Sequence, residues 1–195
     1  MIEPASPAGH AELAASPWVL RFAHLVPPGS RVLDLACGRG RHARLFAARD
    51  CKVIAVDHDA QALAPLYGVP GIETRCVDLE AAPWPFASER FDGVIVTNYL
   101  HRPLLAAIIS AVSGDGALIY ETFARGNEAY GRPANPDHLL VRGELLERAA
   151  GCLEVVAFEQ GMVVEAGRTA VVQRLAAIGF GRDAMPIPGP DTVVR

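Results

Sequence analysis

Apolar positions along the chain fall into short runs that alternate with segments of helical pattern. The run 31–36 is almost wholly apolar, as expected for a strand buried on both faces of a sheet. In 16–25, Val19 and Phe22 lie at helical spacing behind Ser16, a residue type that caps helices. The pattern predicts strands at 31–36, 52–57, 72–77, 91–97, 117–123, 153–159 and 169–177, and helices at 16–25, 40–49, 59–65, 102–112 and 142–150.

Strands that alternate with helices predict an α/β fold with a doubly wound, Rossmann-like parallel sheet and helices on both faces. Such sheets bind ligands beyond the carboxyl ends of their strands, where the strand order reverses. We therefore expect the residues directly after the first five strands to share one crevice. The chain 1–195 is expected to form a single domain, with a helical extension at 1–29 and an irregular tail at 183–195.

Composition narrows the class of protein. The net charge of -4 gives no support for a strongly electrostatic nucleic-acid surface, and no added nucleic-acid domain is evident. The start lacks the pattern of a signal peptide, and no apolar run reaches the roughly 18 residues of a membrane span. We therefore expect a cytoplasmic protein with no membrane partner. The four cysteines form no C-x-x-C pair, which predicts buried free thiols and no metal site.

The stretch RVLDLACGRGRHA carries the first candidate site. Gly38 and Gly40 follow the strand 31–36 and allow the backbone to turn tightly and to approach a ligand closely. The helix that follows directs its free N–H groups toward that ligand. An ordinary strand-to-helix turn would also tolerate glycine, but it would not explain Asp34 inside the strand.

Two more acidic residues lie at the ends of the next two predicted strands. Asp57 closes the strand 52–57, and its carboxylate can accept two hydrogen bonds from a ribose diol. Helix capping is the alternative role, but Asp59 can supply that cap. Asp78 follows the strand 72–77 and can accept a hydrogen bond from an adenine amino group. Together these acids predict a site for an adenosine.

The spacing Gly38-x-Gly40-x-x-Ala43 also fits the dinucleotide pattern, so NAD is an alternative ligand. Asp34 counts against it, because a carboxylate repels a pyrophosphate and attracts a ligand with a positive amine. No Y-x-x-x-K follows any tyrosine, so the usual pair of a short-chain dehydrogenase is absent.

The segments VLDLACGRGRHA, VIAVDHDAQAL, CVDLE and FDGVIVTNYLHRPLL together resemble the class I S-adenosylmethionine-dependent methyltransferase family. NYLHRPLL and the later YETF are similar to its tellurite-resistance-like branch. The resemblance implies S-adenosyl-L-methionine as cofactor and a seven-stranded, mostly parallel sheet with an antiparallel last strand. It also implies the cofactor-binding residues Asp34, Ala36, Cys37, Gly38, Gly40, His42, Asp57, His58, Asp78, Leu79 and Asn98.

The resemblance implies a role for several of these residues. Asp34 would act on the cofactor's amino group, Asp57 on the ribose hydroxyls, and Asp78 with Leu79 on the adenine. Asn98 would offer its backbone carbonyl to the methionine amine.

Methyl transfer is an in-line displacement, so a protein mainly has to align the nucleophile and exclude water. The candidate catalytic residues near the crevice are His101, Glu121 and Tyr99. Each has an alternative: His101 as a helix cap, Tyr99 as a pocket wall, and Glu121 as a structural partner of a residue such as Arg125 or of a substrate amine.

The segment 124–138 is long for a connection, and long ordered loops in this position are often binding loops. A solvated crossover is the alternative. Trp18 and Arg21 are expected to cover the same pocket from the first helix. The candidate substrate-binding residues are therefore Trp18, Arg21, Arg125, Asn127, Tyr130, Arg132 and His138.

These observations indicate an S-adenosylmethionine-dependent methyltransferase that acts on a small-molecule acceptor by in-line transfer, because little sequence is left for a separate substrate domain. An NAD-dependent oxidoreductase and a non-catalytic S-adenosylmethionine-binding partner protein stay open as alternatives. No H-E-x-x-H, G-x-S-x-G or P-loop motif points to another chemistry. Neither the acceptor nor the oligomeric state follows from the sequence.

Overall fold

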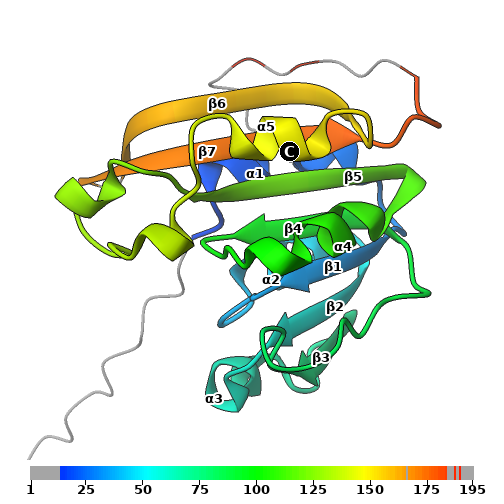
Figure 1. Ribbon diagram of the computed structural model, residues 1–195. Helices are drawn as coiled ribbons and strands as arrows, with labels where there is room; N and C mark the ends of the chain where they lie inside the picture. Colours follow the sequence, from blue (N-terminus) through cyan, green and yellow to red (C-terminus); the bar gives the residue numbers. More distant parts are fainter. Residues whose placement is uncertain (1–13, 166, 184–186, 188, 190–195) are drawn as a thin grey trace, which may run out of the picture.

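The computed structural model describes residues 14–165, 167–183, 187 and 189, and it places seven strands in one sheet (Figure 1). The strand order is β3-β2-β1-β4-β5-β7-β6. The strands are β1 (Arg31–Leu35), β2 (Lys52–Asp57), β3 (Ile72–Cys76), β4 (Phe91–Thr97), β5 (Val112–Phe123), β6 (Glu154–Glu165) and β7 (Arg168–Ile178). All seven predicted strands are present, and the last three are longer than predicted.

Strands β1 to β5 pair in parallel, and β7 pairs antiparallel with both β5 and β6. The predicted doubly wound sheet with an antiparallel last strand is therefore confirmed. The order reverses between β1 and β4, so the rule for open α/β sheets places a ligand crevice at their carboxyl ends.

Short helices cover both faces of the sheet, as predicted. They are α1 (Pro17–Phe22), α2 (Arg41–Ala47), α3 (Ala60–Leu63), α4 (Leu105–Ser110) and α5 (Glu144–Ala149). Single 3-10 turns extend α1, α3 and α4, which explains why their predicted spans were longer. Ser16 caps α1 as predicted, since its side chain accepts a hydrogen bond from the Trp18 N–H.

Alternation along the strands divides the core into two layers. Val32 of β1 packs in the cluster that contains buried residues of α1, α2 and α3, whereas Leu33 and Leu35 pack in the cluster with α4 and α5. The same alternation sends Ile95 of β4 and Ile119 of β5 to the first layer. Residues two positions from these, toward the carboxyl ends, project to that same face.

Polar residues therefore emerge at the carboxyl ends on the α1–α2 face: Asp34 on β1, Thr97 on β4 and Glu121 on β5, all of them buried. Their positions are fixed by strand period alone, because Asp34 follows Val32, Thr97 follows Ile95 and Glu121 follows Ile119 by two residues.

The prediction for the cysteines is half right. Cys37 and Cys51 are buried free thiols, but Cys76 and Cys152 are exposed. Cys76 lies on β3, which forms an edge of the sheet and leaves one face partly open. No described helix is long and apolar enough to cross a membrane. Most of the predicted tail, 183–195, and the first part of the predicted extension, 1–13, lie outside the described residues.

Gly93 supplies a test of this packing. A Cβ on Gly93 would lie 2.9 Å from Val26 Cγ2, so Gly93→Ala must displace the segment that follows α1. We expect the free energy of unfolding to fall by about 1–3 kcal/mol, the usual cost of overpacking. Urea denaturation checks this value. The matched control is Gly114→Ala, whose Cβ would meet nothing within 4 Å; equal losses in the two variants would contradict the packing described here.

Candidate active site

The loop between β1 and α2 turns through three residues with positive φ: Ala36 at 50°, Gly38 at 54° and Gly40 at 76°. The Cys37 N–H donates to the Val56 carbonyl at 2.9 Å, so the loop stays attached to β2. A Cβ on Gly40 would lie 2.4 Å from Leu66 Cδ1, whereas one on Gly38 would meet only open space. Gly40 is therefore required by packing, and Gly38 faces a space that a ligand can enter.

Asp57 holds this loop in place. Its Oδ2 accepts the Gly38 N–H at 2.7 Å, and its Oδ1 accepts the Asp59 N–H at 2.9 Å. Asp59 caps α3 as predicted, by accepting from the N–H groups of Gln61 and Ala62. Each carboxylate oxygen has two acceptor sites, so Asp57 retains capacity for a ligand hydroxyl.

A small cavity of about 230 Å³ lies beside Asp57 at the ends of β1, β2 and β3. Asp78 makes a local turn there, with its Oδ1 accepting from the Glu80 and Ala81 N–H groups. The cavity brings together six residues predicted from the sequence and adds two more. Its lining is Ala36, Asp57, His58, Val77, Asp78, Leu79, Glu80 and Tyr99.

Asp34 lies under the glycine loop with 1% of its surface exposed, and neither carboxylate oxygen has a hydrogen-bond partner among the described residues. The pKa of Asp34 is raised from 3.8 to about 7, chiefly by burial and to a smaller extent by the negative charge of Asp57. The Ala43 N–H and the positive charge of Arg41 act in the opposite direction without reversing the shift in pKa. Burial of a carboxylate without a hydrogen bond costs free energy of folding, and a cationic ligand would offset that cost. Asp34 is therefore a candidate residue for binding a cationic group.

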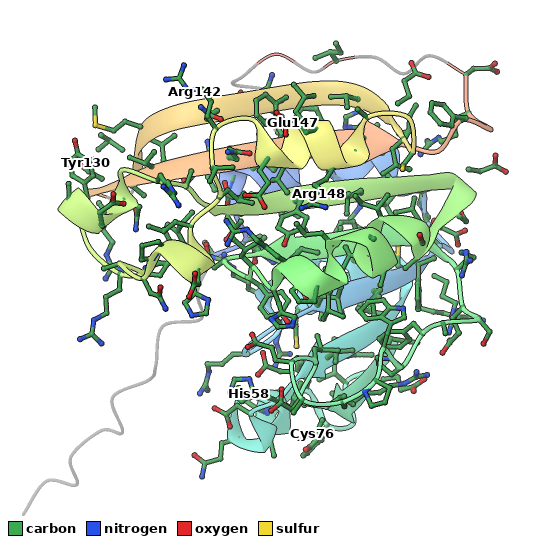
Figure 2. All side chains as sticks on the ribbon, in the orientation of Figure 1. His58, Cys76, Tyr130, Arg142, Glu147 and Arg148 are labelled. Carbon is green, nitrogen blue, oxygen red and sulfur yellow. The ribbon has the colours of Figure 1, made fainter. Side chains whose placement is uncertain are left out.

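A larger cavity of about 780 Å³ opens where β5 and β6 end and where β7 and the 124–138 segment begin. In Figure 2, Tyr130 from this segment and His58 from the end of β2 lie on the same side of the molecule, at which the parallel strands end. The lining is Ser16, Arg41, Asn98, Glu121, Phe123, Asn127, Ala129, Tyr130, Gly131, Arg132, Val163, Glu165, Gly167, Arg168, Thr169, Ala170, Val172 and Arg174.

Glu121 in this cavity is a paired carboxylate. Its Oε2 accepts from Arg174 Nε at 2.5 Å and its Oε1 accepts from Ser16 Oγ at 2.8 Å. The partner suggested from the sequence, Arg125, is wrong: its side chain is exposed, and its backbone N–H donates to the Leu140 carbonyl. The β5–β7 register sets Glu121 directly opposite Arg174, which explains the pairing.

His42 is buried and does not line either cavity. Its Nε2 accepts the Ser16 N–H at 3.1 Å, and its Nδ1 lies 3.4 Å from Thr97 Oγ1. Burial, with the nearby charge of Arg41, lowers the pKa of His42 to about 3, so the ring is neutral and can accept that hydrogen bond. His42 anchors the start of α1 beside the site, and its contact with a cofactor stays a prediction.

Other predicted residues are placed apart from the larger cavity. His101 Nδ1 lies 3.7 Å from Glu80 Oε2, and no hydrogen bond caps a helix through its side chain. Tyr99 faces the small cavity, with its hydroxyl buried and burial raising its pKa. Trp18 is a core residue that donates to the Leu175 carbonyl, and Arg21 pairs with Glu159 at 2.7 Å.

The segment 124–138 divides into residues that face the cavity and residues that do not. Tyr130 and Arg132 line it, whereas Arg125 and His138 do not. Asn127 also lines it, but its side chain bonds the Pro133 carbonyl and the Val171 N–H and so fastens the segment to β7.

Sequence reasoning did not assign Arg41, Arg168 and Arg174 to the site. Arg174 had a signal of the same kind as Asp34, because it is a charged residue inside a mostly apolar strand. Asp34 was interpreted through its neighbouring glycines, and Arg174 has no such motif beside it. Arg168 begins β7 after a turn, where charged residues are common and carry no signal.

Comparison with known proteins gives a consistent picture. Residues 32–114 match the model of a family described as "Methyltransferase domain". The chain is 40% identical over 76 residues to the ribosomal RNA small subunit methyltransferase H of Nostoc sp. strain PCC 7120. That match spans 36% of this chain and 25% of the Nostoc protein.

Solved structures share the fold. TehB from Haemophilus influenzae aligns with a TM-score of 0.73 at 20% identity, over 87% of this chain and 64% of that protein. The 1,6-didemethyltoxoflavin-N1-methyltransferase of Burkholderia thailandensis, solved with 1,6-didemethyltoxoflavin and S-adenosylhomocysteine, aligns with a TM-score of 0.59 at 22% identity, over 84% of this chain and 76% of that one. At these identities the likeness establishes the fold alone.

The Glu121–Arg174 pair yields a stability prediction. Arg174→Met leaves the buried Glu121 carboxylate with only Ser16, so we expect unfolding at pH 7 to cost about 3–5 kcal/mol less. Adding Glu121→Gln removes the stranded charge and is expected to restore part of the loss. Chemical denaturation measures all three proteins. The exposed Arg142→Met is the control; a loss no larger in Arg174→Met than in that variant would show that the pair is not desolvated.

Proposed function

We propose that this chain, whose residues 32–114 match a family described as "Methyltransferase domain", transfers a methyl group from S-adenosyl-L-methionine to a small-molecule acceptor. The observation that carries the proposal is the buried Asp34 carboxylate, which has no partner among the described residues. It lies beside the glycine loop, which runs from Ala36, in the lining of the small cavity, to Arg41, in the lining of the larger one. A ligand with an ammonium group beside an adenosine satisfies both that carboxylate and the acidic small cavity.

The residues present fit that cofactor. In our proposal Asp34 attracts the ammonium group of its methionine part, and Asn98, whose φ is 56°, turns its backbone toward the same part. Asp57 accepts hydrogen bonds from the ribose hydroxyls while it continues to hold Gly38. The oxygen of Asp78 that is free of the local turn accepts from the adenine amino group.

The remaining members of the proposed cofactor site act through shape. Ala36, Leu79 and Tyr99 form the apolar walls of the small cavity, and His58 lies at its mouth with a side chain that is 78% exposed. Cys37 and Gly40 maintain the loop. We assign His42 a supporting role, because it holds Ser16 and makes no contact with either cavity.

The cofactor supplies a methyl group that is already activated by a sulfonium. The chain's task is then to hold the acceptor in line and to keep water away. No His or Cys lines the larger cavity among the described residues, and its two acids, Glu121 and Glu165, both pair with Arg174. We therefore propose that Glu121 positions Ser16 and Arg174, and that neither Glu121, His101 nor Tyr99 serves as a strong general base.

The alternative of an NAD-dependent oxidoreductase fits these charges less well. Asp57 does not discriminate between the two cofactors, because an acid at this strand end also binds the ribose of NAD. Asp34 does discriminate: it is buried without a partner among the described residues, beside the loop that would hold a pyrophosphate, and like charges repel.

Calorimetric titration with S-adenosylhomocysteine and, separately, with NAD tests the proposal. We expect S-adenosylhomocysteine to bind with a micromolar dissociation constant and NAD to give no heat above dilution. Binding of NAD alone would overturn the methyltransferase assignment.

The raised pKa of Asp34 predicts a pH dependence of cofactor binding. An acid whose pKa in the folded protein is about 7 is protonated below that pH, whereas the ligand's ammonium group prefers the carboxylate. The affinity for S-adenosylhomocysteine should therefore fall by up to about tenfold for each pH unit below about 7.

Titration across this range in two buffers of different ionisation enthalpy should reveal release of a proton on binding. Asp34→Asn keeps the shape of the protonated residue, so it should bind more weakly at pH 8 and lose the pH dependence. An unchanged pH profile in Asp34→Asn would remove Asp34 from the cofactor site.

A further inference from the structure

We infer that the methyl acceptor is a small organic anion, whose carboxylate, phosphate or similar group binds Arg132 and Arg168 while its apolar body fills the larger cavity. This inference rests on the proposed function, because it names the substrate class of the same site. Four arginines line this cavity, namely Arg41, Arg132, Arg168 and Arg174.

Arg132 and Arg168 are the guanidinium groups available to a ligand. Both line the cavity, and neither has a hydrogen-bond or ion-pair partner among the described residues. They come from different segments: Arg132 lies in the connection after β5, and Arg168 begins β7. A planar guanidinium binds carboxylate and phosphate oxygens with two parallel hydrogen bonds, so two of them around one cavity favour an anion.

The two acidic residues of the cavity cancel only part of the positive charge of its four arginines. Glu121 and Glu165 each lie 2.5 Å from a nitrogen of Arg174, so Arg174 holds both carboxylates on one side. Because these two acids are already engaged, an incoming anion meets Arg132 and Arg168 without displacing an internal partner.

The rest of the lining provides an apolar surface. Phe123, Val163 and Val172 project from three neighbouring strands, and Tyr130 adds an aromatic ring from the connecting segment. A volume of about 780 Å³ lies in the range of cavities that bind small ligands. An anionic group on an aromatic or aliphatic body matches both parts of the lining.

The described lining contains no free general base, which favours an acceptor whose nucleophilic atom needs none. A thiolate, or an amine lone pair, attacks without prior help from a protein base. The lone pair of the acceptor forms the new bond to the methyl carbon of S-adenosyl-L-methionine. The bond between that carbon and the sulfonium sulfur breaks, and its electron pair stays on the sulfur, which becomes a neutral thioether. Any proton on a neutral nucleophile leaves to water at the cavity mouth.

A nucleic-acid acceptor is less compatible with these features. The chain carries a net charge of -4, and Glu121 and Glu165 line the same opening as the arginines. A phosphate backbone needs an extended basic surface, whereas Arg132 and Arg168 share one cavity with two glutamates.

Matched pairs of acid and amide test the inference, with S-adenosylhomocysteine held at saturation. The probes are 4-mercaptobenzoate, 4-hydroxybenzoate and 4-aminobenzoate, each against its neutral amide, and binding is measured by calorimetry. In parallel, transfer of a radiolabelled methyl group from S-adenosyl-L-methionine is measured. We expect at least one acid to bind about tenfold or more tightly than its amide, which is the scale of a charge-assisted hydrogen bond.

Variants assign the effect to residues. Arg132→Gln and Arg168→Gln should each weaken the acid about tenfold and leave the amide unchanged, with the dissociation constant of S-adenosylhomocysteine also unchanged. Arg142→Gln is the matched control, because Arg142 is an exposed arginine that lines neither cavity.

The outcomes separate the two proposals. If S-adenosylhomocysteine does not bind, the proposed function fails. If it binds but the amides match the acids, no acid binds at millimolar concentration, or both arginine variants behave like Arg142→Gln, the anionic acceptor is overturned and the methyltransferase assignment stands. Tight binding of a short RNA that competes with the acids would likewise overturn the small-molecule acceptor.

Discussion

The ladder of charges across β5, β7 and β6 is the interaction on which the site depends. Arg174 lies opposite Glu121 on one neighbouring strand and opposite Glu159 on the other, and it reaches Glu165 as well. Through Glu121 it also fixes Ser16, which begins α1. The antiparallel hairpin, the first helix and the parallel sheet are therefore joined at one buried ion pair, and that pair forms the floor of the larger cavity.

A second polar chain joins this floor to the glycine loop. His42 accepts from Ser16 and lies beside Thr97, and burial lowers its pKa and so favours the neutral ring that can accept this hydrogen bond. Since His42 belongs to α2, which starts at the glycine loop, the loop and the start of α1 are positioned together. Buried hydrogen-bond networks whose members are all satisfied give rigidity, whereas Asp34 is a buried carboxylate that lacks a partner among the described residues.

The two cavities differ in charge, and this difference separates two kinds of ligand. The small cavity collects carboxylates, with Asp57 and Asp78 next to the buried Asp34, and so suits a ligand with hydroxyl, amino and ammonium donors. The larger cavity collects guanidinium groups, of which Arg132 and Arg168 are unpaired among the described residues. The glycine loop between the two cavities follows β1, and β1 lies beside β4 at the point where the strand order of the sheet reverses.

The sequence by itself determined the fold class and most of the small cavity. Strand runs, glycines and strand-end acids are local signals, and the carboxyl ends of parallel strands must meet at one edge, so Asp57, Asp78 and Tyr99 could be placed before the structure was known. The larger cavity was decided by tertiary structure. The residue that faces Glu121 depends on the register of β7 against β5, which no local sequence pattern predicts. The same holds for the burial of His42 and Trp18. The two-residue period of a strand determines on which face of the sheet a side chain lies, but only the packed sheet determines which residue it contacts there.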